Sequence, residues 1–165
     1  FNSEALGNAW FVDSVKIMPD AYAESQALRE IDPATEAVTD MQFSDAVGSL
    51  ATTSPDYTAY IQLTSYSPDI LEYQSHSDIE KIAIFSDIYY PYGWKAYIDG
   101  TPQPHFRADY ILRAMKIPAG DHQIRFEFRP DSIFKGYIVN ASAKAIILLF
   151  VLFAVVAGIR KRVTA

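Results

Sequence analysis

The fold is decided by the alternating stretch QIRFEFR at residues 123–129. Ile124, Phe126 and Phe128 occupy every second position, and polar or charged residues stand between them. Side chains of a β-strand point alternately to its two faces, so this pattern predicts a strand with one apolar face and one face in solvent. Pro130 ends the strand, because proline cannot donate the backbone hydrogen bond that a neighbouring strand requires.

The sequence before this stretch predicts further short strands that are separated by turns. Residues 82–85 are apolar throughout, as in a central strand covered on both faces. Asp99-Gly100 is a hairpin signal, although Pro102 and Pro104 predict a longer connection. The remaining predicted strands cover residues 7–12, 15–18, 36–39, 57–66, 70–77, 94–99 and 110–117. Closely spaced short strands of this kind predict an antiparallel β-sandwich.

One short helix is predicted near the N-terminus. Asp20 is a suitable N-cap for a helix over residues 21–31, and residues 44–56 are polar and rich in turn formers, as in a loop. The predicted fold class is therefore mainly β: an antiparallel β-sandwich with one short helix near the N-terminus, followed by a C-terminal transmembrane α-helix.

The transmembrane prediction comes from residues 145–159, AIILLFVLFAVVAGI, which are all apolar or glycine. A helix of this length spans only about 23 Å of the ~30 Å hydrocarbon core, so we expect the crossing to cover residues 134–160. The alternative, a buried helix of a soluble protein, would normally show a polar stripe, and this run has none. Lys144 is its weak point, since a charge deep in the bilayer is costly.

Basic residues give the predicted segment its orientation. Arg160-Lys161-Arg162 follow the apolar run at once, and such residues mark the cytoplasmic side. We therefore expect residues 1–133 to form an extracytoplasmic domain and residues 161–165 a basic tail in the cytoplasm. The expected location is therefore a membrane, with the C-terminus on its cytoplasmic side.

Charge and composition exclude several other classes of function. Residues 1–143 carry 10 bases and 20 acids, a net charge of −10, which argues against nucleic acid as a partner. The chain has no cysteine, which excludes disulfides and thiolate ligands. His76, His105 and His122 lack the spacing of metal ligands, and no phosphate-binding loop or hydrolase motif occurs. No metal, cofactor or catalytic residue is predicted.

Aromatic residues gather in the region from residue 87 to residue 97. Aromatic rings beside hydrogen-bonding side chains are how proteins bind carbohydrate, so the region is a candidate for glycan binding. The candidate substrate-binding residues are Asp87, Tyr89, Tyr90, Trp94 and Arg107. The alternative is that these aromatic side chains pack inside the sandwich.

Other charged residues allow two further interpretations. Arg107, Arg113, Asp99 and Asp109 are expected to form ion pairs at the hairpin ends. Four carboxylates, Glu72, Asp78, Asp87 and Glu127, include possible partners for a glycosidase pair. Acidic residues on exposed strand faces are the simpler interpretation.

Three segments of the chain carry motifs that point to a known family. The first, FSDIYYPYGWKAYIDG at residues 85–100, is similar to a YYPxGWxAYIDG stretch of the YfhO family of bacterial membrane proteins. The second comprises HFRADYILRAM at residues 105–115 and IPAGDH at residues 117–122, and the third is LGNAWFV at residues 6–12. The resemblance covers nearly the whole chain, in order, and implies a location in the bacterial cytoplasmic (inner) membrane.

The resemblance implies a part in glycan assembly. Family members are multi-spanning proteins with a GT-C-like membrane core, associated with the transfer of sugars from a polyprenyl-phosphate donor to envelope polymers. The chain resembles their C-terminal extracytoplasmic part and last helix. The implied partners are the lipid bilayer, the membrane core of the parent chain and a cell-envelope glycan, which this non-catalytic segment would help to bind. The alternative is a membrane-anchored binding or scaffold module with no enzymatic role.

Overall fold

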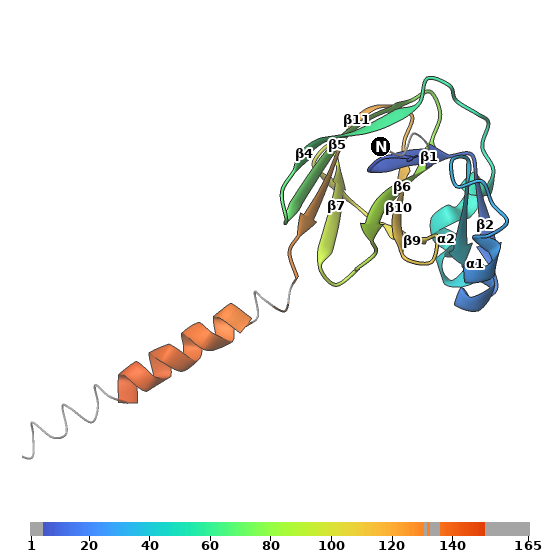
Figure 1. The fold of residues 1–165 in the computed structure, drawn as a ribbon. Coiled ribbons are helices and arrows are strands. Elements are labelled where there is room, and N and C mark those ends of the chain that lie inside the picture. Colours follow the sequence, from blue (N-terminus) through green and yellow to red (C-terminus); the bar gives the residue numbers. More distant parts are fainter. Residues whose placement is uncertain (1–4, 131, 133–135, 151–165) are drawn as a thin grey trace, which may run out of the picture. The chain divides into compact units, whose positions relative to one another are not determined.

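The computed structural model describes residues 5–130, 132 and 136–150, and its fold is shown in Figure 1. The chain divides into two compact units, Phe1–Arg129 and Pro130–Ala165. The first unit contains two antiparallel sheets and a smaller parallel pair of strands. The prediction of a mainly β, antiparallel fold is therefore confirmed.

The larger sheet has five strands, with β11 at its centre. Its strands, in spatial order, are β4 (Tyr60–Tyr66), β5 (Ile70–Ser77), β11 (Gly120–Phe128), β7 (Trp94–Ile98) and β8 (Thr101–Gln103). The stretch at residues 123–129 contributes most of β11, and Ile124 and Phe126 are buried as the alternation predicts. Asp99 and Gly100, with φ of 50° and 77°, join β7 to β8 in a two-residue turn, which is shorter than the predicted connection.

The second sheet has four strands and faces the first across a shared core. Its order is β1 (Ala9–Val12), β6 (Lys81–Ile88), β10 (Leu112–Ile117) and β9 (Phe106–Ala108). Phe85 and Met115 from this sheet pack with Tyr73 and Phe126 from the five-stranded sheet. This apolar contact between the inner faces holds the two layers together.

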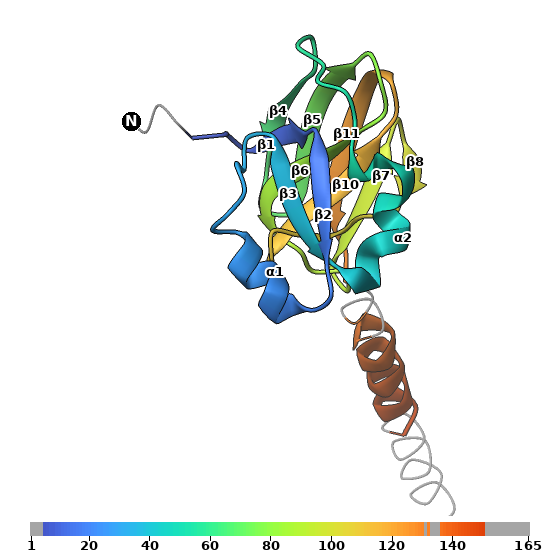
Figure 2. The ribbon, with the colours of Figure 1, turned by 90° about the vertical axis from the view of Figure 1, so that its right-hand side faces the viewer.

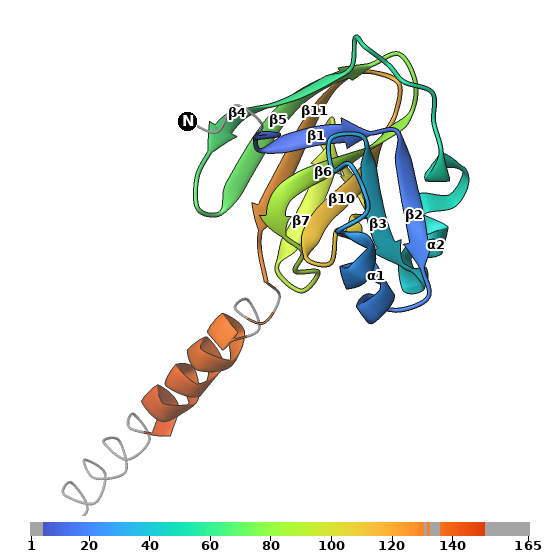
Figure 3. The same ribbon diagram turned by 45° about the vertical axis from the view of Figure 1, so that its right-hand side comes forward.

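A third layer covers the other face of the four-stranded sheet. It contains the parallel strands β2 (Ser14–Met18) and β3 (Glu36–Asp40), which Figure 2 shows in front of β6 and β10. Figure 3 shows the same order of layers from an oblique side. A second core of Val12, Ala37, Ile82 and Ile84 lies at this contact. Strand β6 is therefore covered on both faces, as predicted, whereas the five-stranded sheet keeps one face open.

The prediction of a single short helix near the N-terminus is wrong. Helix α1 (Ala21–Ala27) is shorter than the predicted segment, although Asp20 caps it through a 2.8 Å bond from the Ala23 amide. A second helix, α2 (Ser44–Val47), lies in the predicted loop between two 3₁₀ turns, Met41–Phe43 and Gly48–Ala51. Val47 and Leu50 are buried in the second core, so packing orders a stretch whose composition favours a loop.

The second unit contains a helix over residues 136–150. Many of its apolar side chains are exposed, among them Tyr137, Ile138, Val139, Leu149 and Phe150. In the part of the chain that the structure describes, no helix is both long enough and apolar enough to cross a membrane. Residues 134, 135 and 151–160 of the predicted crossing lie outside the described residues.

Candidate functional site

Two of the predicted site residues, Trp94 and Asp87, lie beside a buried arginine. The side chain of Arg113 is enclosed, with only 1% of the residue exposed. Its guanidinium carbon lies 4.5 Å from the ring centroid of Trp94 and 4.4 Å from that of Phe126. Burial lowers the pKa of Arg113, and the charge of Asp87 opposes that effect. Trp94 and Asp87 therefore stabilise an internal cation.

The other three predicted residues have different neighbours. Arg107 donates a 2.6 Å hydrogen bond to the buried carboxylate of Glu24, and its guanidinium lies 5.7 Å from the ring centroid of Phe43. Tyr89 packs edge-on against the same Phe43 ring, also at 5.7 Å. Tyr90 is 46% exposed and packs against the ring of Tyr92 in the turn that follows β6 and against Phe128 at the end of β11. The structure thus brings Tyr89 and Arg107 together, in a packed environment.

The expected ion pairs are replaced by other contacts. Asp99 pairs with His122, whose Nδ1 lies 2.6 Å from its carboxylate. Asp109 is buried and accepts a 2.9 Å bond from the Val38 amide, and burial raises the pKa of Asp109 to about 6. Burial also raises the pKa of Glu24, and the hydrogen bond from the Tyr110 amide and the charge of Arg107 partly offset this effect. The contacts of Asp109 with Val38 and of Arg107 with Glu24 hold the third layer to the four-stranded sheet.

The outer face of the five-stranded sheet carries a different set of polar side chains, which are accessible to a ligand. The register places Gln62, Gln74 and Gln123 in one row across β4, β5 and β11. The next row contains Glu72, Arg125 and Tyr97 on β5, β11 and β7. The alternate residues of these strands, such as Tyr73, Ile124 and Phe126, point to the shared core. We call these two rows of side chains the polar platform; the buried inner face of the same strands holds it in place.

The platform contains a hollow of about 650 Å³. Its lining residues are Thr64, Glu72, Tyr73, Gln74, Tyr97, Gly100, Gln123, Ile124, Arg125 and Glu127. Arg125 Nη1 donates a 2.8 Å hydrogen bond to Glu72 Oε1, and both side chains remain partly exposed. An ion pair in solvent adds little to stability, so its donors and acceptors can exchange partners at small cost.

A second hollow, of about 310 Å³, lies on the same sheet. It is lined by Tyr60, Gln74, Ser75, Asp99, Asp121, His122 and Gln123. Gln74 and Gln123 line both hollows and lie directly opposite each other in the register of β5 and β11. The two hollows therefore meet at this pair of side-chain amides.

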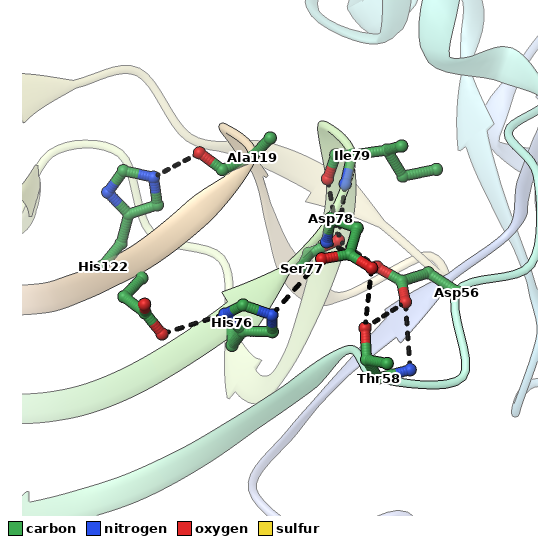
Figure 4. A network of polar contacts seen from close by, with 9 residues as sticks. Asp56, Thr58, His76, Ser77, Asp78, Ile79, Ala119 and His122 are labelled. Atoms are coloured by element: carbon green, nitrogen blue, oxygen red, sulfur yellow. Dashed lines mark hydrogen bonds and ion pairs between the residues drawn. The ribbon is translucent and has the colours of Figure 1, made fainter.

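Next to the second hollow, a network of polar contacts joins β5, β11 and the loop before β4 (Figure 4). His76 Nδ1 lies 2.9 Å from Asp121 and its Nε2 lies 3.5 Å from Asp78. The hydrogen bond to Asp121 raises the pKa of His76. Hydrogen bonds led by that from Thr58 hold the pKa of Asp56 well below its usual range. Within residues 5–130, 132 and 136–150, no group of three or more His, Cys, Asp or Glu side chains is arranged to hold a metal ion.

Sequence reasoning identified the orientation of these side chains but not their importance. The alternation in residues 123–129 predicts that Gln123, Arg125 and Glu127 point outward, yet that is the ordinary state of an exposed strand face. The missing information is the register, which decides that Gln74 lies opposite Gln123 and Tyr97 opposite Arg125. Two polar rows, each across three strands, are visible only once the strands are paired.

Comparisons of the chain with known protein families, with curated proteins and with solved structures find no match.

Proposed function

We propose that the chain binds a glycan on the outer face of its five-stranded sheet, as the membrane-anchored, extracytoplasmic part of a protein of the bacterial envelope. The observation that carries the proposal is the hollow of about 650 Å³ around Tyr97, Arg125, Glu72 and the two glutamines. It combines an aromatic ring with amide, carboxylate and guanidinium groups on strands whose opposite faces are fixed in the core.

The chemistry of these side chains suits a sugar. Side-chain amides of Gln74 and Gln123 both donate and accept, as sugar hydroxyl groups do. Arg125 and Glu72 supply a donor and an acceptor of higher strength, and the ring of Tyr97 offers an apolar surface for C–H groups. A rigid sheet fixes the backbone beneath these groups, so binding has to order only their side chains.

The membrane part of the proposal rests on the second unit and its sequence. Apolar side chains such as Ile138, Ile147 and Leu149 are exposed on the helix of residues 136–150 and need a cover of lipid or protein. The sequence continues with an apolar run as far as residue 159, followed by three basic residues. These features support a crossing over residues 134–160, with residues 1–133 extracytoplasmic and the C-terminus in the cytoplasm.

The motif resemblance extends the proposal to a parent protein. We assign the chain to the C-terminal part of a multi-spanning YfhO-like glycosyltransferase, or of an accessory to one, that acts on envelope glycans. In this arrangement the sheet face presents an acceptor glycan, and the chemistry takes place in the membrane core of the parent chain. The expected partners remain that core, the bilayer and the glycan.

Retention on purified envelope glycan tests the sheet face. The full chain in detergent micelles should be retained, and Arg125→Ala and Tyr97→Ala should each weaken retention about tenfold, the loss expected for one charge-assisted hydrogen bond or one ring contact. Tyr22→Ala is the matched control, since Tyr22 lies on α1 and is 74% exposed. Equal retention of all four proteins would refute the proposal.

One observation favours a second candidate, a membrane-anchored scaffold module without glycan binding. Trp94, Tyr89 and Arg107 all have partners inside the fold, so the aromatic-rich stretch serves packing. A scaffold would bind its membrane partner equally well with Arg125→Ala or Tyr97→Ala, and would not be retained on glycan.

A further inference from the structure

We infer that the two hollows on the five-stranded sheet act as one groove for an extended, uncharged glycan chain, with a tyrosine at each end. The inference rests on the proposed function and specifies its ligand: several linked sugars rather than a single one, without carboxylate or phosphate groups.

The glutamine pair joins the two hollows into one groove. Gln74 and Gln123 are the residues that both hollows share, and they are register partners on neighbouring strands. The lining on β11 runs from Asp121 in the second hollow to Glu127 in the first. At ~3.3 Å per residue this is a length of about 20 Å, which exceeds the size of one sugar ring.

The two tyrosines lie at opposite corners of this groove. Tyr60 is on β4 and lies in the row of His76 and Asp121, whereas Tyr97 is on β7 and lies opposite Arg125. Four residues along β11 and three strand spacings separate them, a diagonal of roughly 20 Å from the standard strand geometry. A ligand that uses both rings must therefore be an extended chain.

The ring of Tyr60 is held ready for contact. It stacks on the imidazole of His76, with ring centroids 6.1 Å apart and planes at 22°, and His76 is itself fixed by Asp121. Tyr60 nevertheless remains 51% exposed and lines the second hollow. A ring that is oriented but uncovered loses little conformational freedom when a sugar packs on it.

Charge around the groove favours an uncharged chain. The charged side chains that line it are paired: Arg125 with Glu72 at 2.8 Å and His122 with Asp99 at 2.6 Å. Asp121 is likewise paired with His76, at 2.9 Å. Glu127 lies opposite Lys95 in the register. Because an imidazole is charged only when it is protonated, the lining carries more carboxylates than cations, so a polyanion gains no attraction here.

The test compares ligand lengths on the full chain in detergent micelles, by titration calorimetry. The neutral probes are cello-oligosaccharides and chito-oligosaccharides, each in a short and a long form. The polyanionic probe is polygalacturonate. The long neutral form should bind more tightly than the short one. Tyr60→Ala should lower the affinity for the long form about five- to tenfold and leave the affinity for the short form unchanged.

Tyr66→Ala is the matched control, because Tyr66 is on the same strand, is 72% exposed and lines neither hollow. It should bind both forms like the unaltered chain. Equal affinity for short and long forms, or no effect of Tyr60→Ala, would overturn the extended groove while leaving glycan binding intact. Tighter binding of polygalacturonate would overturn the uncharged ligand, and no binding of any probe would overturn the proposed function as well.

Discussion

The guanidinium of Arg113 lies between two aromatic rings, 4.5 Å from the ring centroid of Trp94 and 4.4 Å from that of Phe126. Nε and Nη1 of Arg113 are buried and have no hydrogen-bond partner among the described residues. The rings and the carboxylate of Asp87 therefore provide much of what stabilises this charge in the interior. Removal of either ring should therefore destabilise the fold, because the buried guanidinium loses part of what stabilises its charge.

We expect Trp94→Ala to destabilise the fold by about 3 kcal/mol, because it leaves a cavity and an uncovered buried cation. Thermal melting followed by circular dichroism measures this effect. Tyr92→Ala is the control, since Tyr92 is exposed in the turn before β7. Arg113→Met, which removes the charge and fills a similar volume, should cost less than Trp94→Ala, and the reverse order would contradict this account of the pair.

A second prediction concerns Arg107, a residue that the sequence suggested for glycan binding. Its 2.6 Å bond to Glu24 compensates a fully buried carboxylate. Arg107→Ala should therefore destabilise the fold by about 3 to 5 kcal/mol, as expected when one partner of a buried pair is lost. Chemical denaturation gives the value.

The double variant Glu24→Gln with Arg107→Met removes both charges. It keeps a side-chain oxygen at position 24 for the Tyr110 amide, which in the unaltered chain donates to Glu24 Oε1 at 2.9 Å. It should recover most of the lost stability. Equal losses in the single and double variants would show that the charge left behind by Arg107→Ala is not the cause.

A third prediction follows from the buried carboxyl of Asp109. Its pKa is raised from 3.8 to about 6, so between these values the folded protein binds more protons than the unfolded chain. The contribution of Asp109 to stability therefore falls as the pH rises from about 4 to about 6. Glu24, whose pKa is also raised, adds a slope of the same sign.

Asp109→Asn should reduce this slope and raise the free energy of unfolding at pH 7 by about 1 to 3 kcal/mol. Asparagine keeps an oxygen for the Val38 amide and tolerates the φ of 49° at this position. Urea denaturation at several pH values provides the measurement, with Asp45→Asn at an exposed site as control. An unchanged slope in Asp109→Asn would assign the pH dependence to other groups.

The sequence was sufficient where the decisive pattern is local. Alternation over residues 123–129 orients Phe126 inward and Arg125 outward, because the two-residue period belongs to the strand itself. The apolar run at residues 82–85 likewise identifies a strand covered on both faces.

The sequence was insufficient where partners come from distant segments. Arg113 is buried because Trp94 and Phe126, on other strands, enclose it, and an isolated arginine in a strand pattern is expected to face solvent. The parallel pairing of β2 with β3 and the glutamine row of β4, β5 and β11 depend on register, which no short pattern specifies. The sequence leaves the role of the aromatic stretch open for the same reason, since ring-bearing residues serve a core and a binding face equally well.

The last prediction concerns residues 134–160. If they cross a membrane, the full chain should stay with the membrane fraction after washing with high salt and alkaline carbonate, because its retention is hydrophobic rather than electrostatic. A chain that ends at Arg129, the boundary of the first unit, should be released by the same treatment. A reporter fused after Ala165 should be active only on the cytoplasmic side, where the three basic residues before it are expected to stay. Release of the full chain, or an active reporter outside the cell, would remove the basis for an extracytoplasmic sheet face and for an envelope glycan as its ligand.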